Sequence, residues 1–215
     1  MAQLTRFRRW VSRRFRPRRM ARFVERMGIR EDTSVLDVGG TDAIWSLLPL
    51  RPRLVILNRH PRRRALGHTV VGDGRYLPFP DGAVDVVFSN SVIEHVGGRD
   101  AQQRFADECR RVGRGYYVQT PSRAFPFEPH AMGFFLHWLP RKWQISAVRW
   151  CSLWGLMTRP SREGAEAMVD GLHLLTESDL RRLFPDAEIW VERVLGMAKS
   201  LVAVRYADRG LDERP

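Results

Sequence analysis

Short apolar runs alternate with polar, helix-like stretches along this chain from about residue 33 onward. The runs lie at 34–38, 54–57, 69–71, 84–88, 116–119, 189–194 and 201–204. Nearly continuous apolar strands that alternate with helices are typical of a mainly parallel sheet whose two faces are covered. We therefore predict an α/β fold with a seven-stranded, mostly parallel sheet and helices on both faces.

Two of the intervening helices have clear sequence signals. Residues 100–112 place Phe105, Cys109 and Val112 at the i, i+4 and i+7 spacing of a buried helix face. Thr176 and Asp179 form a capping-box pattern, with Asp in the usual Glu/Gln place, which predicts a helix through Leu183.

The positive charge of the chain is concentrated at its start. Residues 1–30 contain eleven arginines and one acid, a net charge of +10, whereas the whole chain carries +12. We therefore divide the chain into an arginine-rich arm at 1–30 and a nearly neutral domain at 31–215. Only two of the 36 basic residues are lysines, so the arginine bias is general and does not by itself assign a role to each arginine.

The arm allows several interpretations. Apolar residues recur at helical spacing among its arginines, which suits an anionic membrane surface bound through residues 1–20. The same charge suits nucleic acid or a mitochondrial presequence. The alternative is a helix that packs on the domain through its apolar side, and Ala21, Val24 and Met27 would contribute to that contact. The apolar residues that recur at helical spacing form a stripe of Leu4, Phe7, Trp10 and Val11.

Residues 121–175 interrupt the alternation of strands and helices. This segment holds five prolines and four of the seven tryptophans. Because loops on a rigid scaffold often carry specificity, we predict a lid or acceptor-recognition insertion here. Its aromatic residues suit an apolar or aromatic ligand, and packing on the sheet or a dimer contact is the alternative.

The turns after the first four strands are the expected ligand site, because open α/β sheets bind ligands at the carboxyl ends of their strands. Asp37-Val38-Gly39-Gly40-Thr41 follows the first run, and a glycine turn lets the backbone approach a ligand closely. Asn58 ends the second run, and Gly72-Asp73-Gly74 ends the third. Asn90 and Ser91 follow the fourth.

These segments resemble the Rossmann-like class I methyltransferases. The run from Phe79 to Val96, with Asp81-Gly82, Asp85 and Glu94-His95-Val96, is similar to the methyltransferase type 11 family, and Leu77-Pro78-Phe79 matches it too. The segment Thr120-Pro121-Ser122-Arg123-Ala124-Phe125-Pro126-Phe127-Glu128-Pro129-His130 resembles one bacterial branch of that family. The resemblance covers roughly residues 33–204.

The resemblance implies S-adenosyl-L-methionine as the cofactor. Asp73 would accept from the adenine amino group, and Asn58 stands where the family has an acid that binds the ribose. The later glycines of the first motif are Thr41 and Ala43 here. The candidate cofactor-binding residues are Asp37, Gly39, Gly40, Thr41, Asn58, Asp73, Gly74, Asn90 and Ser91.

The expected activity is methyl transfer to a small-molecule acceptor, with oxygen as the expected acceptor atom. An oxygen acceptor usually needs a base, for which His130 and His95 are the candidates, with His137 as a further histidine and Glu128 as a group that orients His130. Glu94-His95 also resembles a Glu-x-x-Glu-His metal motif of ubiquinone-pathway O-methyltransferases. Its first glutamate is Ser91 here, so we predict no metal.

The remaining expectations concern partners and location. No apolar run approaches the roughly 20 residues of a membrane span, and Cys109 and Cys151 show no metal or disulfide spacing. We expect a cytoplasmic protein, with attachment to the inner membrane face as an alternative. A non-catalytic binding protein and a nucleic-acid methyltransferase are the rival functions. The absence of an Asn-Pro-Pro-Tyr-type motif after the fourth strand disfavours the second, and oligomeric state is left open.

Overall fold

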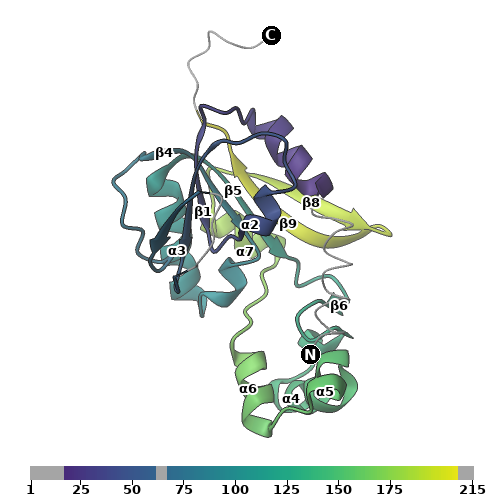
Figure 1. Cartoon of the computed structure of the whole chain (residues 1–215). Coiled ribbons are helices and arrows are strands. Elements are labelled where there is room, and N and C mark those ends of the chain that lie inside the picture. The colour runs from purple at the N-terminus through teal and green to yellow at the C-terminus, as the bar shows by residue number, and fades with distance from the viewer. Residues whose placement is uncertain (1–16, 62–66, 208–215) are drawn as a thin grey trace.

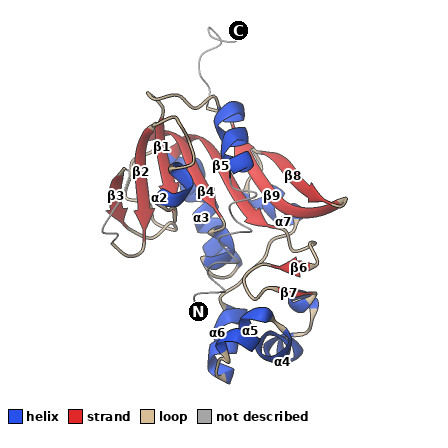
Figure 2. Cartoon of the chain, turned by 45° about the vertical axis from the view of Figure 1, so that its right-hand side comes forward, coloured by secondary structure: helices blue, strands red, loops and turns tan. Residues whose placement is uncertain are grey.

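The computed structural model describes residues 17–61 and 67–207 (Figure 2). Its strands are β1 (Ser34–Val38), β2 (Arg53–Asn58), β3 (His68–Val71), β4 (Val84–Asn90), β5 (Gly113–Pro121), β6 (Phe127–Glu128), β7 (Gly133–Phe134), β8 (Glu188–Val194) and β9 (Met197–Arg205). Its helices are α2 (Asp42–Trp45), α3 (Arg99–Val112), α4 (Arg141–Cys151), α5 (Leu153–Thr158), α6 (Arg162–Asp170) and α7 (Glu177–Leu183). Two 3₁₀ turns are η1 (Ile93–His95) and η2 (Leu136–Trp138). Residues 17–27 are also helical.

Seven strands form one sheet in the order β3-β2-β1-β4-β5-β9-β8. The pairs from β3 to β5 are parallel, and β9 is antiparallel to both β5 and β8. Strand order reverses between β1 and β4, so the carboxyl ends of these strands flank the expected ligand crevice. The predicted Rossmann-like, mostly parallel sheet is confirmed.

Each face of the sheet has its own apolar core, because successive strand residues point to opposite sides. On one face, Leu36 and Val87 pack with Phe105 and Cys109 of α3 and with α7. On the other, neighbouring strand residues pack with helix 17–27 and α2. Helices therefore cover both faces, as predicted (Figure 1). The predicted capping box at Thr176 and Asp179 is also present.

Helix 17–27 is part of the folded domain. Met20, Phe23 and Met27 are buried, and the ring of Phe23 packs edge-on against those of Phe88 and Tyr117. Ala21, expected to contribute to this contact, is exposed, because the buried stripe is offset by one residue. The apolar stripe from Leu4 to Val11 lies outside the described residues.

Arg19 connects this helix to the carboxyl edge of the sheet. Its guanidinium pairs with Glu192 of β8 at 2.7 Å and donates to Asn90 Oδ1 of β4 at 2.8 Å and to Gln119 Oε1 of β5 at 3.1 Å. Burial raises the pKa of Glu192, but hydrogen bonds from Arg19 outweigh that effect and hold the pKa below its ordinary value. With its bond to Ser200 Oγ of β9 at 3.3 Å, this one arginine of the arm contacts four strands.

Replacing Arg19 by methionine should destabilise the fold by about 3 kcal/mol, because it leaves the Glu192 carboxylate in a mostly buried position without its partner. For a chain of this size the melting temperature should fall by about 6–12 °C. The loss should be complete above pH 4.5 and shrink as the pH falls below it, because protonated Glu192 no longer needs the arginine.

Arg22→Met is the matched control, because Arg22 lies 3.8 Å from the same carboxylate but is 53% exposed. We expect it to change stability by less than about 0.5 kcal/mol. Equal losses in the two variants, measured by thermal unfolding, would contradict this account of Arg19.

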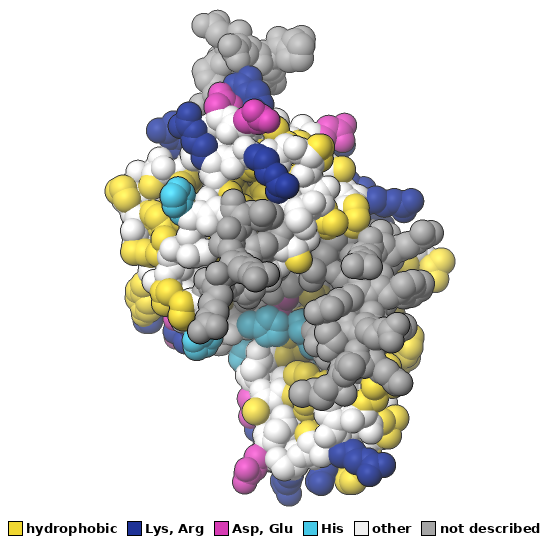
Figure 3. Space-filling view, in the orientation of Figure 1, with side chains coloured by type: hydrophobic (Ala, Val, Ile, Leu, Met, Phe, Trp, Pro, Cys, Tyr) yellow, Lys and Arg dark blue, Asp and Glu magenta, His cyan; other side chains and the backbone are white. Residues whose placement is uncertain are grey.

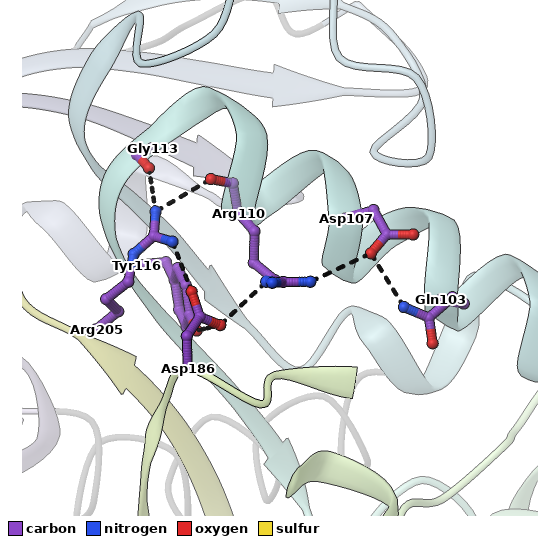
Figure 4. Close-up of polar contacts among 7 residues, drawn as sticks. All are labelled: Gln103, Asp107, Arg110, Gly113, Tyr116, Asp186 and Arg205. Carbon is purple, nitrogen blue, oxygen red and sulfur yellow. Dashed lines mark hydrogen bonds and ion pairs between the residues drawn. The ribbon is translucent and has the colours of Figure 1, made fainter. Parts of the chain in front are cut away.

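A second polar network fastens α3 to the sheet (Figure 4). The carboxylate of Asp186 accepts from Tyr116 Oη at 2.8 Å, from Arg110 Nε at 3.0 Å and from Arg205 Nη1 at 2.6 Å. Arg205 also donates to the carbonyls of Arg110 and Gly113, which lie at the carboxyl end of α3. This network lies away from the crevice and serves the fold.

The segment after β5 forms a small helical subdomain, which we define as residues 127–170. It contains the β6–β7 hairpin and helices α4 to α6, which pack on one another through a separate apolar cluster. Figure 1 shows it beside the edge of the sheet at which β5 ends. Within the described residues, no helix is long and apolar enough to cross a membrane.

Candidate functional site

The turn after β1 is tightly built around Asp37. The carboxylate is buried and accepts from Trp45 Nε1 of α2 at 2.6 Å. Gly39 has φ +79°, and a Cβ there would lie 2.6 Å from Val92. A Cβ at Gly40 would lie 1.5 Å from Asp37 Oδ2. Both glycines are therefore required for the shape of this turn.

Asn58 holds the same turn from β2. Its Nδ2 donates to the carbonyl of Gly40 at 3.0 Å. A carboxylate cannot donate, so an acid at this position would place two acceptors against each other. The amide that departs from the family pattern thus has a structural reason, and its Oδ1 remains able to accept from a hydroxyl.

Asp73 and Gly74 follow β3. Asp73 accepts from Arg75 Nη2 at 2.6 Å and from the backbone nitrogen of Arg75 at 3.0 Å. The hydrogen bond from Arg75 is the main reason that the pKa of Asp73 lies below its ordinary value. A Cβ at Gly74 would lie 2.8 Å from Phe105, so this glycine permits close packing against α3.

Asn90 and Ser91 lie at the end of β4. Asn90 accepts from Arg19, and Ser91 Oγ donates to Gln119 Oε1 at 3.1 Å. Ser91 adopts φ +59°, in the left-handed region that few residues other than glycine adopt. Thr41 is half-buried and directly precedes α2, and its carbonyl accepts from the backbone nitrogen of Ile44.

His95 and His130, 35 residues apart in the sequence, meet just beyond β4. Their Nε2 atoms are 3.0 Å apart, and their ring planes are nearly perpendicular. Nδ1 of His130 lies 2.6 Å from Glu128 Oε1, and Nδ1 of His95 lies 3.2 Å from the carbonyl of Gly171. The predicted pairing of Glu128 with His130 is thus present, whereas the His95–His130 contact was not expected.

Two buried carboxylates flank this pair. Glu128 also accepts from the backbone nitrogens of His130 and Ala131. Burial raises the pKa of Glu128, but the hydrogen bond from His130 and these backbone bonds outweigh it, so the pKa lies below its ordinary value. Burial raises the pKa of Glu94 to about 7. Glu94 Oε2 accepts from Thr120 Oγ1 at 3.0 Å, whereas Glu94 Oε1 has no hydrogen-bond partner among the described residues.

The three side chains Glu94, His95 and His130 each present a ligand atom within 4.8 Å of the others. Sequence reasoning missed this cluster because it compared only Ser91, Glu94 and His95 with a metal motif. His130 comes from the insertion, and no local pattern connects it to η1. Figure 3 shows histidines gathered between the sheet domain and the helical subdomain.

His137 does not join the cluster. Its Nε2 lies 3.0 Å from the carbonyl of Arg123, and burial lowers the pKa of its ring. It lines a cavity of about 280 Å³ with Arg99, Arg123 and Gln144. Leu172 and His173 line the same cavity and follow Gly171, the residue that contacts His95. The cavity is therefore close to the histidine pair.

The aromatic residues of the insertion do not line this cavity. Five of them are exposed, and Trp154 is half-buried in the apolar cluster of the subdomain. This cavity is instead lined mainly by polar side chains, whereas Trp150 lines two other pockets on the helical subdomain. The exposed residues are Phe134, Phe135, Trp138, Trp143 and Trp150.

Residues 51–115 match the family model described as methyltransferase domain. This match spans β2 to the start of β5 and includes Asn58, Asp73, Asn90 and His95. No curated protein matches the sequence.

Solved structures share the fold at low sequence identity. A chain from the complex that contains the Haloferax volcanii Trm112 methyltransferase activator aligns with a TM-score of 0.58 and 17% identity, over 99% of this chain and 97% of its own. The PH0226 protein of Pyrococcus horikoshii OT3 aligns with a TM-score of 0.55 and 14% identity, over 88% and 87%. Magnesium protoporphyrin IX methyltransferase of Synechocystis PCC 6803, solved with bound SAH, aligns with a TM-score of 0.52 and 11% identity, over 91% and 84%.

The family match and the sheet order agree with the motifs at the carboxyl edge of the sheet. Residues 51–115 therefore match a methyltransferase domain on a Rossmann-like sheet, and S-adenosylmethionine is the methyl donor that this match supports.

Proposed function

We propose that this enzyme transfers the methyl group of S-adenosylmethionine to an oxygen atom of a small-molecule acceptor. The observation that carries the proposal is the His95–His130 pair, which Glu128 and Gly171 hold directly beyond the end of β4. An oxygen acceptor must lose its proton during transfer, and a positioned pair of imidazoles promotes that loss.

The donor would lie along the carboxyl ends of β1, β2 and β4. Gly39 and Gly40 let it approach the backbone, and Asn58 Oδ1 is placed to accept from a ribose hydroxyl. Asp73 would accept from the adenine amino group while it keeps its contact with Arg75, because a carboxylate offers about four lone-pair sites. Asn90, Ser91 and Thr41 would complete the set of side chains that contact the donor, which we call the donor wall.

The acceptor would enter between the sheet domain and the helical subdomain. The polar cavity that His137, Arg99 and Arg123 line is the described space next to the histidine pair. Its arginines and amides suit an acceptor rich in hydroxyl or anionic groups. A cell-envelope saccharide or lipid precursor, or another secondary metabolite, fits this chemistry.

Methyl transfer from S-adenosylmethionine with a radiolabelled methyl group tests the proposal. We expect label to enter a small molecule from fractionated cell extracts and to depend on the chain. Mass spectrometry should place the methyl group on oxygen. Label in nucleic acid or on nitrogen or carbon would overturn the proposed acceptor, and binding of donor without any transfer would favour a non-catalytic protein.

Replacing Asp73 by alanine should weaken binding of S-adenosylhomocysteine by about 10- to 100-fold, because a hydrogen bond to a charged group contributes about 1.5–3 kcal/mol. Asp81→Ala is the control. Asp81 is an aspartate of the following loop, 82% exposed and paired with Arg111. Calorimetric titration should show nearly unchanged affinity for the control, and an equal loss in both variants would remove Asp73 from the donor site.

A further inference from the structure

The hydrogen bonds of His95 and His130 fix where their ring protons lie. The carbonyl of Gly171 can only accept, so Nδ1 of His95 carries the proton that it donates there. Glu128 Oε1 already accepts from the backbone nitrogen of His130, and Oε2 accepts from that of Ala131, so this carboxylate is an acceptor and Nδ1 of His130 donates to it. In two neutral imidazoles, each Nε2 then presents a lone pair.

Those two lone pairs face each other across 3.0 Å. Two acceptors at this distance repel each other, so a positively charged species must lie between them. A shared proton or a metal cation satisfies this requirement. The histidine geometry alone does not distinguish the two.

The environment of Glu94 favours a metal cation over a shared proton. Its side chain is fully buried, and Oε1 has no hydrogen-bond partner among the described residues, although a ligand atom of this carboxylate lies within 4.8 Å of both imidazoles. An unsatisfied buried polar atom costs about 1–3 kcal/mol. A proton between the histidines leaves that oxygen unsatisfied, whereas a divalent cation binds it and both nitrogens.

The surroundings match those of histidine metal ligands. Such histidines usually donate their second ring nitrogen to a carboxylate or a backbone carbonyl, as His130 and His95 do here. Two nitrogens at about 2.05 Å from a tetrahedral ion lie about 3.3 Å apart, a few tenths of an ångström more than the Nε2 separation. Thr120, which donates to Glu94 Oε2, orients the third ligand.

We propose that Glu94, His95 and His130 bind a divalent transition-metal cation. Two imidazoles and one carboxylate suit Zn²⁺, Mn²⁺, Fe²⁺ or Co²⁺ better than Mg²⁺ or Ca²⁺, which prefer oxygen ligands. Three protein ligands leave one position open, and the exposed side of His95 faces solvent. This inference rests on the proposed function only in its next step: the open position would take the acceptor oxygen, whose proton the cation makes more acidic.

Metal binding by the full-length chain, without a histidine tag and after dialysis against a chelator, tests the site. We expect calorimetric titration with ZnCl₂ and with MnCl₂, and elemental analysis after gel filtration, to give one ion per chain. Glu94→Gln, His95→Gln and His130→Gln should each weaken binding by more than about 100-fold. Glu128→Gln, which removes only the orienting group, should weaken it by about 10- to 100-fold.

His68→Gln is the matched control, because His68 is an exposed histidine on the edge strand β3. It should bind metal as the natural chain does. Absence of stoichiometric binding, or binding unchanged in all three ligand variants, would overturn the metal site.

Titration of the metal-free chain with S-adenosylhomocysteine separates this inference from the proposed function. Donor binding and methyl transfer by a metal-free chain that also fails to bind added ZnCl₂ or MnCl₂ would overturn the site alone and leave the shared proton. Stoichiometric metal that the ligand variants lose, in a chain that transfers no methyl group, would support the site and count against the proposed function.

Discussion

Replacing His130 by glutamine is expected to lower kcat for methyl transfer by about 10²–10⁴-fold, the range typical of a group that assists proton transfer. The affinity for S-adenosylhomocysteine should change by less than about twofold, because His130 lies beyond the proposed donor wall. His130 is mostly buried and held by Glu128, so glutamine fills the space without the second ring nitrogen. Initial rates at saturating donor and acceptor measure the effect.

Glu128→Gln and His68→Gln show whether the loss belongs to the pair. The first should lower kcat by a smaller factor, because His130 is still present but is no longer held in one tautomer by a carboxylate. The second should leave kcat unchanged. Full activity of His130→Gln would remove the histidine pair from the reaction.

Gly40→Ala is expected to have the largest effect on the donor site. The added methyl group would lie 1.5 Å from Asp37 Oδ2, and the neighbouring atoms are the rest of that buried carboxylate. Either Asp37 loses its hydrogen bond from Trp45 or the turn moves away from Asn58. Overpacking of this kind costs about 3 kcal/mol, which corresponds to about 6–12 °C in melting temperature. Binding of donor should become undetectable.

Gly98→Ala is the control for this substitution. Gly98 precedes α3, has φ −68° and has no atom within 4 Å of the position of an added Cβ. Its melting temperature and donor affinity should stay close to those of the natural chain. Normal donor binding by Gly40→Ala would show that the turn after β1 does not contact the donor.

Much of the fold could be predicted because interior parallel strands are apolar runs. The predicted cores of β1, β2, β3 and β4 agree with the structure within one or two residues at each end. β5 and β9 are longer than predicted, because polar residues at their ends, such as Thr120 and Ser200, pair with the neighbouring strand. Such pairing depends on register across the sheet, and a local sequence pattern does not contain it.

The candidate site was predictable as a set of positions but not as a set of contacts. The motifs place Asp37, Asn58, Asp73 and Asn90 at the ends of their strands, as expected. The bond from Asn58 to Gly40 links residues 18 apart, and Arg19 contacts Asn90 from 71 residues away. The sequence also did not single out Arg19, because arginine is abundant throughout the chain.

The role of the insertion at residues 121–175 could be predicted least from the sequence, because it depends on which residues the tertiary structure brings together. Its aromatic residues suggested an apolar pocket, but most of them lie on the surface of the helical subdomain. His130 gains its significance from contact with His95, which belongs to η1 in the sheet domain. Only the fold shows that these two residues meet beside the carboxyl edge.

Calorimetric titration of the purified chain with S-adenosylmethionine and S-adenosylhomocysteine tests the central claim most directly. The account predicts one site per chain with a dissociation constant in the range of about 1 μM to 1 mM, as is usual for enzymes and their substrates. Asp81→Ala and Gly98→Ala should bind equally well. The absence of measurable binding to either compound by the correctly folded natural chain would contradict the account, because the turns after β1, β2 and β3 would then not form a donor site.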